Sequence, residues 1–352
     1  MSSTLSSSNK KLLLEGTVIP AHPLALDEQR KLDEKYQRAL SRYYMATGAG
    51  GIAVGVHTTQ FEIREPRFNL YETVLRMASE EVDRAELKRP FLKVAGIAGS
   101  TSQAVKEAEL ARNLKYDLGL LSNGGLPDLT EKELIERVQR VSEVIPVFGF
   151  YLQPAVGGRV LSFDFWHQFA ANKNVHAIKV AAFNRYQTLD VVRAVCQSDR
   201  ADEIALYTGN DDNIVADLLT TYRFEKNGKI IEKKFVGGLL GHWAFWTKKA
   251  VELLQEIKNL HSKDISNMLT KGIEITDVNA AAFDPAHHYH GCITGINEIL
   301  RQQGLLRTNL CLLEKETLSV GQAEEIVRVH RAYPHLNDDG FVRENLSKWL
   351  NF

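Results

Sequence analysis

Lys179 stands inside the apolar run "VHAIKVA" at 175–181. The run predicts a short buried strand. Burial of an ammonium group is costly unless the group is paired or loses its proton. A lysine that is neutral near physiological pH can attack a ketone or aldehyde and form a Schiff base. On the residues alone, a structural role is the alternative, in which the side chain extends to the surface or pairs with a carboxylate.

Tyr151 is the candidate for the proton transfers that Schiff-base chemistry also requires. It ends the apolar run at 145–151, which comes before the lysine run in the sequence. If the two runs form neighbouring strands, the tyrosine hydroxyl can lie near the amine. Together, Lys179 and Tyr151 predict covalent catalysis on a carbonyl compound.

Eight short apolar runs alternate with stretches of helical period. They lie at 16–20, 50–56, 91–98, 117–121, 145–151, 175–181, 203–208 and 235–240. Such alternation indicates βαβ units and a parallel sheet. Eight units over about 240 residues give the size of a (β/α)8 TIM barrel. The alternative is a doubly wound sheet, whose glycine fingerprint follows its first strand, whereas the glycines of "ATGAGGIAVG" precede one.

The sequence divides into three parts. The serine-rich start predicts a flexible N-terminal tail over 1–15, and the alternating runs predict the barrel over 16–260. Helical period without strand runs predicts a C-terminal helical extension over 261–352. A charged insert at 222–234 predicts a hairpin or mobile loop before the last strand.

Composition excludes several kinds of partner. The 352 residues include 43 basic and 44 acidic side chains, so no basic excess indicates nucleic acid or an anionic membrane surface. No apolar run approaches the roughly 18 residues of a spanning helix. The three cysteines are far apart and fit neither a disulfide framework nor a zinc site. A cytoplasmic protein is the simplest expectation.

The ends of the predicted strands supply further candidates, because barrel active sites lie at the carboxyl ends of the strands. The polar residues and glycines at these ends are His57, Thr58, Thr59, Ser122, Asn123, Tyr207, Thr208, Gly209, Asn210 and His242. Among them, His57, Gly209 and Asn210 are the candidates for substrate binding. His242 is expected to begin the next helix and to pack there.

Several stretches, in the right order, resemble the dihydrodipicolinate synthase and N-acetylneuraminate lyase superfamily of class I aldolases. They are "GTVIPAHPLALD", "GAGGIAVGVHTTQF", "IPVFGFYLQP", "HAIKVA", "YTGNDD" and "GGLLG". The resemblance covers roughly residues 14 to 310. It implies a (β/α)8 barrel that acts without a cofactor or metal, assembles into dimers or tetramers and uses a 2-keto acid such as pyruvate.

By this resemblance, Lys179 forms the imine and Tyr151 relays the proton. Two alignments with the family's pair of threonines leave the hydroxyl partner of the tyrosine open. A strict positional match sets His57 against one of the family's two threonines, and a shift of two residues sets Thr58 and Thr59 there. We favour Thr58 and Thr59, because this match retains the hydroxyl chemistry.

Departures from the family pattern bear on the substrate. Leu152 replaces the asparagine that follows the family tyrosine, and Val180 replaces a frequent acidic residue. The arginine that binds a second carboxylate in dihydrodipicolinate synthases is missing from the start of the next loop, and Arg159 arrives later. The amides of Gly157 and Gly158 are expected to hold a single carboxylate instead. Aspartate semialdehyde is therefore not expected to be the partner.

A histidine cluster at 283–291, "FDPAHHYHG", has spacings that a metal site can use. We favour another interpretation, in which Asp284 and Pro285 cap a helix that begins there and the histidines occupy its first turns. Overall, the sequence predicts an aldolase or lyase. A dehydratase of keto-deoxy sugar acids and a non-catalytic binding or regulatory barrel are the alternatives.

Overall fold

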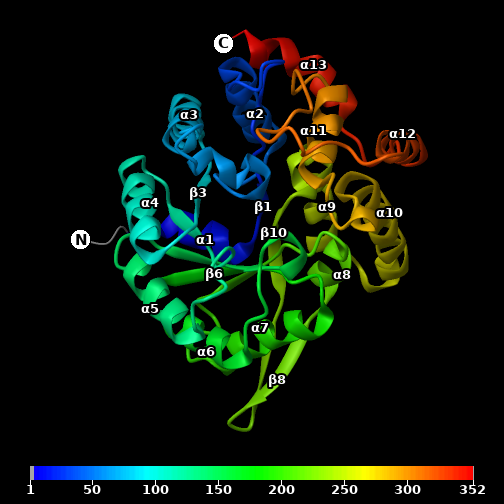
Figure 1. Ribbon diagram of the computed structural model, residues 1–352. Coiled ribbons are helices and arrows are strands. Elements are labelled where there is room, and N and C mark those ends of the chain that lie inside the picture. Colours follow the sequence, from blue (N-terminus) through cyan, green and yellow to red (C-terminus); the bar gives the residue numbers. More distant parts are fainter. Residues whose placement is uncertain (1–3, 352) are drawn as a thin grey trace. The chain divides into compact units, whose positions relative to one another are not determined.

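The computed structural model describes residues 4–351, which form two compact units. The first unit consists of the residues up to Thr17 and Pro90–Leu239. The second consists of Val18–Arg89 and the residues from Leu240 onward. Each unit therefore combines segments that are far apart in the sequence (Figure 1).

A parallel sheet forms the core of the first unit. Its strands lie in the order β3-β4-β5-β6-β7-β10. They are β3 (Leu92–Ile97), β4 (Leu118–Ser122), β5 (Val147–Leu152), β6 (Val175–Ala181), β7 (Ala205–Thr208) and β10 (Phe235–Leu240). Nearly every strand residue is buried. This explains the continuous apolar runs, since parallel strands are covered on both faces.

Helices follow the strands of the first unit along the chain. They are α4 (Thr101–Asn113), α5 (Glu131–Ser142), α6 (Phe163–Ala171), α7 (Arg185–Gln197) and α8 (Ile214–Leu219). At the start of α5, the Thr130 hydroxyl accepts a hydrogen bond from Glu133 N at 3.3 Å, and the Glu133 carboxylate accepts one from Thr130 N at 2.7 Å. This is a capping box. On β5, a Cβ added to Gly149 would lie 2.6 Å from the Phe169 ring, so this glycine lets α6 approach the sheet closely.

The second unit contains the first two strands and the C-terminal helices. The elements are β1 (Val18–Pro20), β2 (Gly51–Val54), α2 (Glu34–Thr47), α3 (Tyr71–Arg84), α9 (Thr247–Lys258), α10 (Ile265–Phe283), α11 (Cys292–Gln302), α12 (Gln322–Ala332) and α13 (Asp339–Leu350). Within the extension, Arg328 on α12 donates two hydrogen bonds of 2.8 Å to Asp277 on α10. This bidentate pair links two helices of the extension that α11 separates in the sequence.

The strand order β1-β10-β7-β6-β5-β4-β3-β2 is that of a (β/α)8 barrel. All eight predicted strands are present, and helices α10 to α13 form the C-terminal extension. The predicted fold class is therefore confirmed. The insert at 222–234 is an antiparallel hairpin of β8 (Tyr222–Lys226) and β9 (Lys229–Lys233). Its turn residues, Asn227 and Gly228, have φ of 51° and 76°, as an Asn-Gly hairpin turn requires.

The flexible tail predicted over 1–15 is wrong for most of its length, and its first three residues lie outside the described part of the chain. Helix α1 (Ser7–Glu15) begins after Ser6, whose hydroxyl accepts a hydrogen bond from Asn9 N at 3.2 Å. Leu13 is fully buried, and its carbonyl accepts a hydrogen bond from the Tyr207 hydroxyl at 3.0 Å. The helix is thus anchored to the sheet of its own unit by a contact that the local sequence does not reveal.

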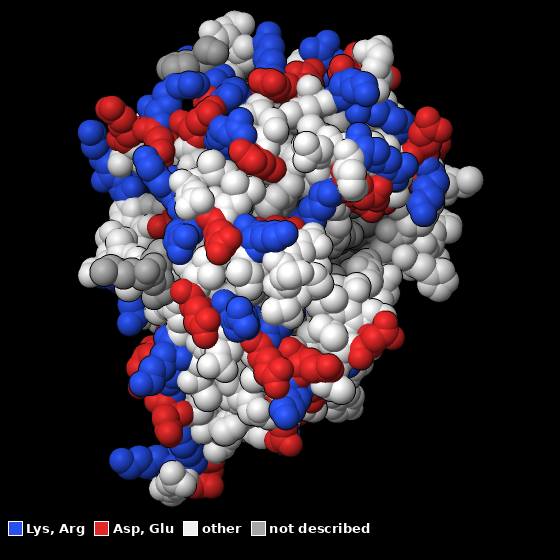
Figure 2. Space-filling view, turned by 60° about the vertical axis from the view of Figure 1, so that its left-hand side comes forward, with Lys and Arg blue, Asp and Glu red and all other residues white. Residues whose placement is uncertain are grey.

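Basic and acidic side chains are interspersed on the face drawn in Figure 2. This fits the net charge of −1. Within residues 4–351, no helix has the length and apolar character that crossing a membrane requires.

Candidate active site

Strand register decides which side chains share a face with Lys179. On neighbouring strands, Phe150 and Tyr207 are the register partners of Lys179, and Ser122 is the partner of Phe150. Partners in a parallel sheet point to the same side, and successive residues alternate. The Lys179 Nζ accordingly lies over the Phe150 ring, 4.4 Å from its centre. Ser122, Phe150, Lys179 and Tyr207 therefore form one row, which we call the lysine row.

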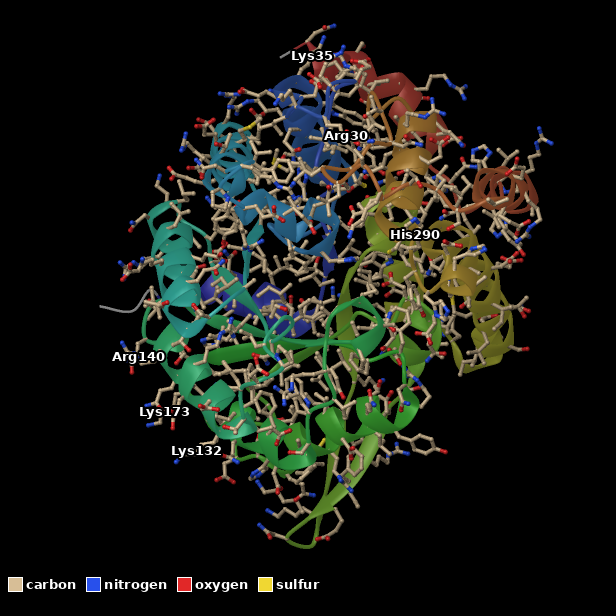
Figure 3. All side chains as sticks on the ribbon, in the orientation of Figure 1. Arg30, Lys35, Lys132, Arg140, Lys173 and His290 are labelled. Carbon is tan, nitrogen blue, oxygen red and sulfur yellow. The ribbon has the colours of Figure 1, made fainter. Side chains whose placement is uncertain are left out.

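Burial shifts the amine of Lys179 toward its neutral form. Burial lowers its pKa to about 8, although the negative charge of Asp211 opposes part of this shift. Gly209 makes room for the side chain, because a Cβ there would lie 2.6 Å from the Lys179 Cε. By contrast, Figure 3 shows Lys132 and Lys173 at the outer edge of the molecule, where both are exposed to solvent. Lys179 thus combines burial, an aromatic neighbour and a lowered pKa.

Tyr151 does not lie in the lysine row, which corrects the sequence interpretation. Its register partner is Val180, so it points to the opposite side of the sheet from Lys179. There its ring stacks on Trp166 of α6, with the centres 5.3 Å apart, and its hydroxyl accepts a hydrogen bond from Leu161 N at 3.4 Å. Burial also raises the pKa of Tyr151. The structure therefore gives no support to a proton relay from Tyr151 to the imine.

Asn210 is held in a buried network at the end of β7. Its Nδ2 donates to Asp217 at 2.9 Å, and its Oδ1 accepts from Phe183 N at 2.9 Å. The same carboxylate accepts hydrogen bonds from the Thr208 hydroxyl at 2.7 Å and from the Arg185 guanidinium. Both ends of the Asn210 amide are thus occupied. The residue positions the loop after β7, and the expectation that it binds substrate finds no support.

The glycine pair after β5 does not offer free amides, which corrects a second expectation. Gly157 N donates to the Pro154 carbonyl at 3.1 Å, and Gly158 N donates to the Gln153 carbonyl at 3.0 Å. A Cβ on Gly158 would lie 1.8 Å from the Leu152 carbonyl oxygen. The glycines therefore serve a tight turn, and the carboxylate site predicted there stays a prediction that this turn does not support.

Arg159 is fixed by the neighbouring loop. Its Nη1 donates to the carbonyls of Leu126 and Leu129, at 3.1 and 2.7 Å. These carbonyls belong to the β4–α5 loop, so the guanidinium ties this loop to the one after β5. Arg159 accordingly serves loop structure.

The second unit carries the threonine candidates. The Thr59 hydroxyl donates to the His22 carbonyl at 2.6 Å and accepts from Gly55 N at 3.0 Å. The Thr58 hydroxyl also donates to the His22 carbonyl, at 3.3 Å. Both threonines are buried, whereas His57 is partly exposed. The two hydroxyls join the segments that follow β1 and β2, and a catalytic role for either residue stays a prediction.

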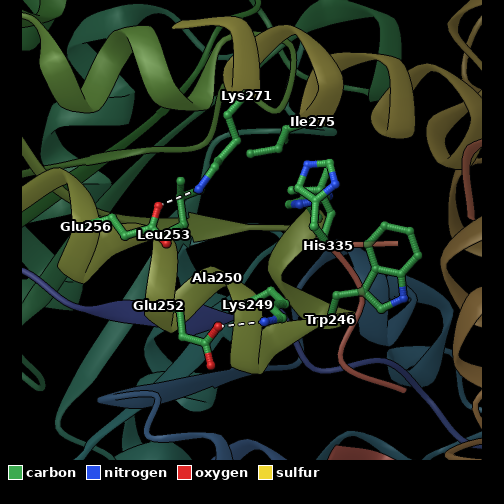
Figure 4. A pocket seen from close by; sticks show the side chains of 11 residues that line it. Trp246, Lys249, Ala250, Glu252, Leu253, Glu256, Lys271, Ile275 and His335 are labelled. Atoms are coloured by element: carbon green, nitrogen blue, oxygen red, sulfur yellow. Dashed lines mark hydrogen bonds and ion pairs between the residues drawn. The ribbon is translucent and has the colours of Figure 1, made fainter. Parts of the chain in front are cut away.

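His242, which follows the last barrel strand, packs in the second unit as expected. It lies in a 3-10 turn, His242–Ala244, and burial lowers its pKa to about 4. Figure 4 shows the pocket that it helps to line, which has a volume of about 60 Å³. Ion pairs flank this pocket, Lys249 with Glu252 at 2.8 Å and Lys271 with Glu256 at 2.5 Å. Such a volume holds a few water molecules and is too small for a sugar-acid substrate.

The histidine cluster forms no metal site. Among the described residues, no group of histidine, cysteine and carboxylate side chains could hold a metal ion. Asp284 ends α10 with φ of 57°, and only a single 3-10 turn, Pro285–His287, follows it. The predicted helix is therefore a single 3-10 turn, with Asp284 at its N-cap and Pro285 as its first residue, and of the histidines only His287 lies in it. The Asp284 carboxylate instead bonds His287 Nδ1 at 2.6 Å and Ser319 Oγ at 2.5 Å, while His290 is exposed.

Solved structures share this architecture. A monomeric dihydrodipicolinate synthase variant aligns with 92% of this chain and 98% of its own, at a TM-score of 0.72 and 20% identity. The chain has the fold of dihydrodipicolinate synthases and N-acetylneuraminate lyases. The dihydrodipicolinate synthase of Oceanobacillus iheyensis aligns at a TM-score of 0.73 and 16% identity, over 93% of this chain and 99% of its own.

The N-acetylneuraminate lyase of Fusobacterium nucleatum, in a complex with pyruvate, aligns at a TM-score of 0.70 and 16% identity. The alignment covers 92% of this chain and 99% of the lyase. No family model matches the sequence, and neither does any curated protein. The similarity is therefore one of fold, and the evidence for the chemistry lies in the residues of this chain.

The sequence did not reveal that Phe150 and Ser122 share a face of the sheet with Lys179. The sequence does show that Phe150 and Tyr151 must point to opposite sides of a strand. Which of them shares a side with Lys179 depends on the register between β5 and β6. The register shifts between Val147 and Phe148, and no local signal in the sequence predicts this shift.

Proposed function

We propose that the protein is a Schiff-base aldolase or lyase of the dihydrodipicolinate synthase and N-acetylneuraminate lyase superfamily, with Lys179 as its nucleophile. The observation that carries the proposal is the buried amine in the lysine row. Its pKa is lowered to about 8, so a useful fraction is neutral near physiological pH. Its Nζ lies 4.4 Å from the centre of the Phe150 ring, in an apolar setting that favours the uncharged form.

The chemistry follows from a neutral amine in such a place. The amine adds to the carbonyl carbon of the substrate, and loss of water from the adduct gives a protonated imine. The imine then accepts the electron pair of a bond next to the former carbonyl, which allows that bond to break or form. Asp211 carries a negative charge close enough to affect Lys179, and it would stabilise the positive charge of the imine.

A 2-keto acid is the proposed substrate class, in line with the pyruvate complex of the structurally similar lyase. Aspartate semialdehyde is not the proposed partner, because a dicarboxylate product calls for a cation near the site. The Nη1 of Arg159 already donates hydrogen bonds to two backbone carbonyls of the β4–α5 loop. We therefore favour a larger or less charged electrophile. A sugar-acid dehydratase that uses the same imine is the alternative enzyme.

A barrel that binds keto acids without turnover is the second candidate. The placement of Phe150 beside Lys179 favours it, because an aromatic ring without a hydroxyl cannot transfer protons. Both candidates form an imine, and only the enzyme turns it over.

Borohydride trapping and turnover assays with a panel of 2-keto acids and sugar acids test the proposal together. Trapping with turnover of at least one compound supports the enzyme, and trapping without turnover supports the binding barrel. If no 2-keto acid is trapped, the proposed function fails.

A further inference from the structure

We infer that the hydroxyl of Ser122 is the group that moves protons at the imine, in place of a tyrosine. This inference rests on the proposed function of Lys179. Ser122 ends β4, and it is the register partner of Phe150, which is in turn the partner of Lys179. All three side chains therefore point to the same side of the sheet.

The position of the amine brings Ser122 within reach. Neighbouring strands lie about 4.8 Å apart, so β4 and β6 are separated by roughly 10 Å. The long side chain of Lys179 covers part of this distance, because its Nζ lies over Phe150 on the strand between them. A substrate carbon bonded to the nitrogen would then lie on the same side of the sheet as the Ser122 hydroxyl.

The Ser122 oxygen is also held in place by its own loop. Its oxygen accepts a hydrogen bond from Gly124 N at 3.1 Å, and its proton goes to no acceptor among the described residues. Ser122 is 4% exposed, so the hydroxyl is sheltered from solvent. A fixed oxygen with an unassigned proton can accept one proton and release another.

The other candidate hydroxyls of the first unit are committed elsewhere. Tyr207 shares the lysine row, but its hydroxyl donates to the Leu13 carbonyl of α1. Thr208 donates to the buried carboxylate of Asp217. Tyr151 points to the helix layer and stacks on Trp166. Ser122 thus combines the correct face with a hydroxyl proton that is available.

The step assigned to Ser122 balances without any further reactant. When the amine adds to the carbonyl, the nitrogen becomes positive and the oxygen negative. Ser122 Oγ takes a proton from this nitrogen and gives its own proton to the oxygen, which produces the neutral carbinolamine. One N–H bond breaks, one O–H bond forms, and the serine hydroxyl is regenerated.

The test compares Ser122→Ala with Tyr151→Phe, each of which removes one hydroxyl. For Ser122→Ala we expect turnover and the rate of borohydride trapping to fall by about 10²-fold or more, within the range of general acid–base help. The trapped fraction after long incubation should be close to that of the wild type, because the lysine is intact. Ser122→Thr should recover part of the rate, while Tyr151→Phe should keep nearly all of it.

The outcomes separate the two proposals. If the wild type is trapped and Ser122→Ala reacts as fast, the inference about Ser122 is overturned and the role of Lys179 stands. A large loss in Tyr151→Phe with none in Ser122→Ala would also overturn it. If Ser122→Ala does not fold, Ser122→Gly provides the same comparison. If no keto acid is trapped by the wild type, both proposals fail.

Discussion

The two sides of strand β5 place adjacent residues in different surroundings. On one side, the Phe150 ring lies under the amine of Lys179. On the other side, Tyr151 packs against Trp166 in the helix layer. The two residues are adjacent in the sequence, and the one with the chemically useful group is on the side away from the lysine. Strand register, and not residue type, therefore determines which of these side chains lies beside the lysine.

The same contrast holds on β7. Tyr207 shares the row of Lys179, whereas Thr208 points to the network around Asp217. The next two residues after Thr208 also have different roles. Gly209 makes room for the Lys179 side chain, and Asn210 fixes the loop after β7. The ends of β5 and β7 thus each carry one residue in the lysine row and one that packs in the scaffold.

Lys179→Met should have the largest effect, with complete loss of imine trapping and turnover. It should also raise the free energy of unfolding at pH 7 by about 3 kcal/mol, since the pKa falls from 10.5 to about 8 and each unit is worth about 1.4 kcal/mol. The gain is full below pH 8, where the folded wild type buries a charge. It disappears as the pH rises towards 10.5, where both states are neutral. Denaturant unfolding at several pH values measures it, and a destabilised variant at pH 7 would contradict it.

The pH profile should report the lowered pKa of Lys179. Below pH 8 only the neutral fraction reacts, so the rate of imine formation should rise about tenfold per pH unit and level off near the pKa of about 8. Asp211→Asn should move the inflection to lower pH, because the carboxylate raises the pKa. Rapid borohydride trapping between pH 5.5 and 9.5 is the measurement, with the range chosen around that pKa. An inflection near the ordinary lysine value would show that the amine is not desolvated.

Gly209→Ala should lower kcat/KM by about 10–100-fold, because small displacements of a reacting group are costly. The added Cβ would lie 2.6 Å from Lys179 Cε and 2.8 Å from Ala181 Cβ, so the lysine must move. Gly340→Ala is the matched control, since no atom lies within 4 Å of its added Cβ. Equal kinetics for the two variants would mean that Gly209 does not shape the path of the lysine.

Tyr151→Phe should have the smallest effect, with turnover within about threefold of the wild type. Loss of a true proton relay would cost roughly 10²–10⁴-fold. The hydroxyl accepts only one long hydrogen bond, 3.4 Å from Leu161 N, so stability should also change little. Steady-state kinetics on the folded variant decide between these magnitudes, and a loss in the larger range would restore Tyr151 as the relay.

Much of the fold could be predicted from the sequence, because its signals are local. The apolar runs located all eight strands, and Thr130 with Glu133 located the start of α5. Helix α1 was missed, since its stability depends on contacts such as that between Leu13 and Tyr207, which are 194 residues apart in sequence.

The candidate site was harder to predict, for a physical reason. Lys179 was found because a charge in an apolar run is a local anomaly. The orientation of Tyr151 depends on the pairing of two strands, and the use of the Gly157 and Gly158 amides depends on how a loop folds back. Neither the register nor the path of the loop is encoded in a short stretch of residues.

Peptide mapping after reduction tests the central claim most directly. The full-length protein is incubated with pyruvate and borohydride, digested, and analysed by mass spectrometry, with Lys179→Met as the control. We expect a single reduced pyruvate adduct on the peptide that contains Lys179, and none in the variant. An adduct on another lysine, equal labelling of the variant, or no adduct with any 2-keto acid would contradict it.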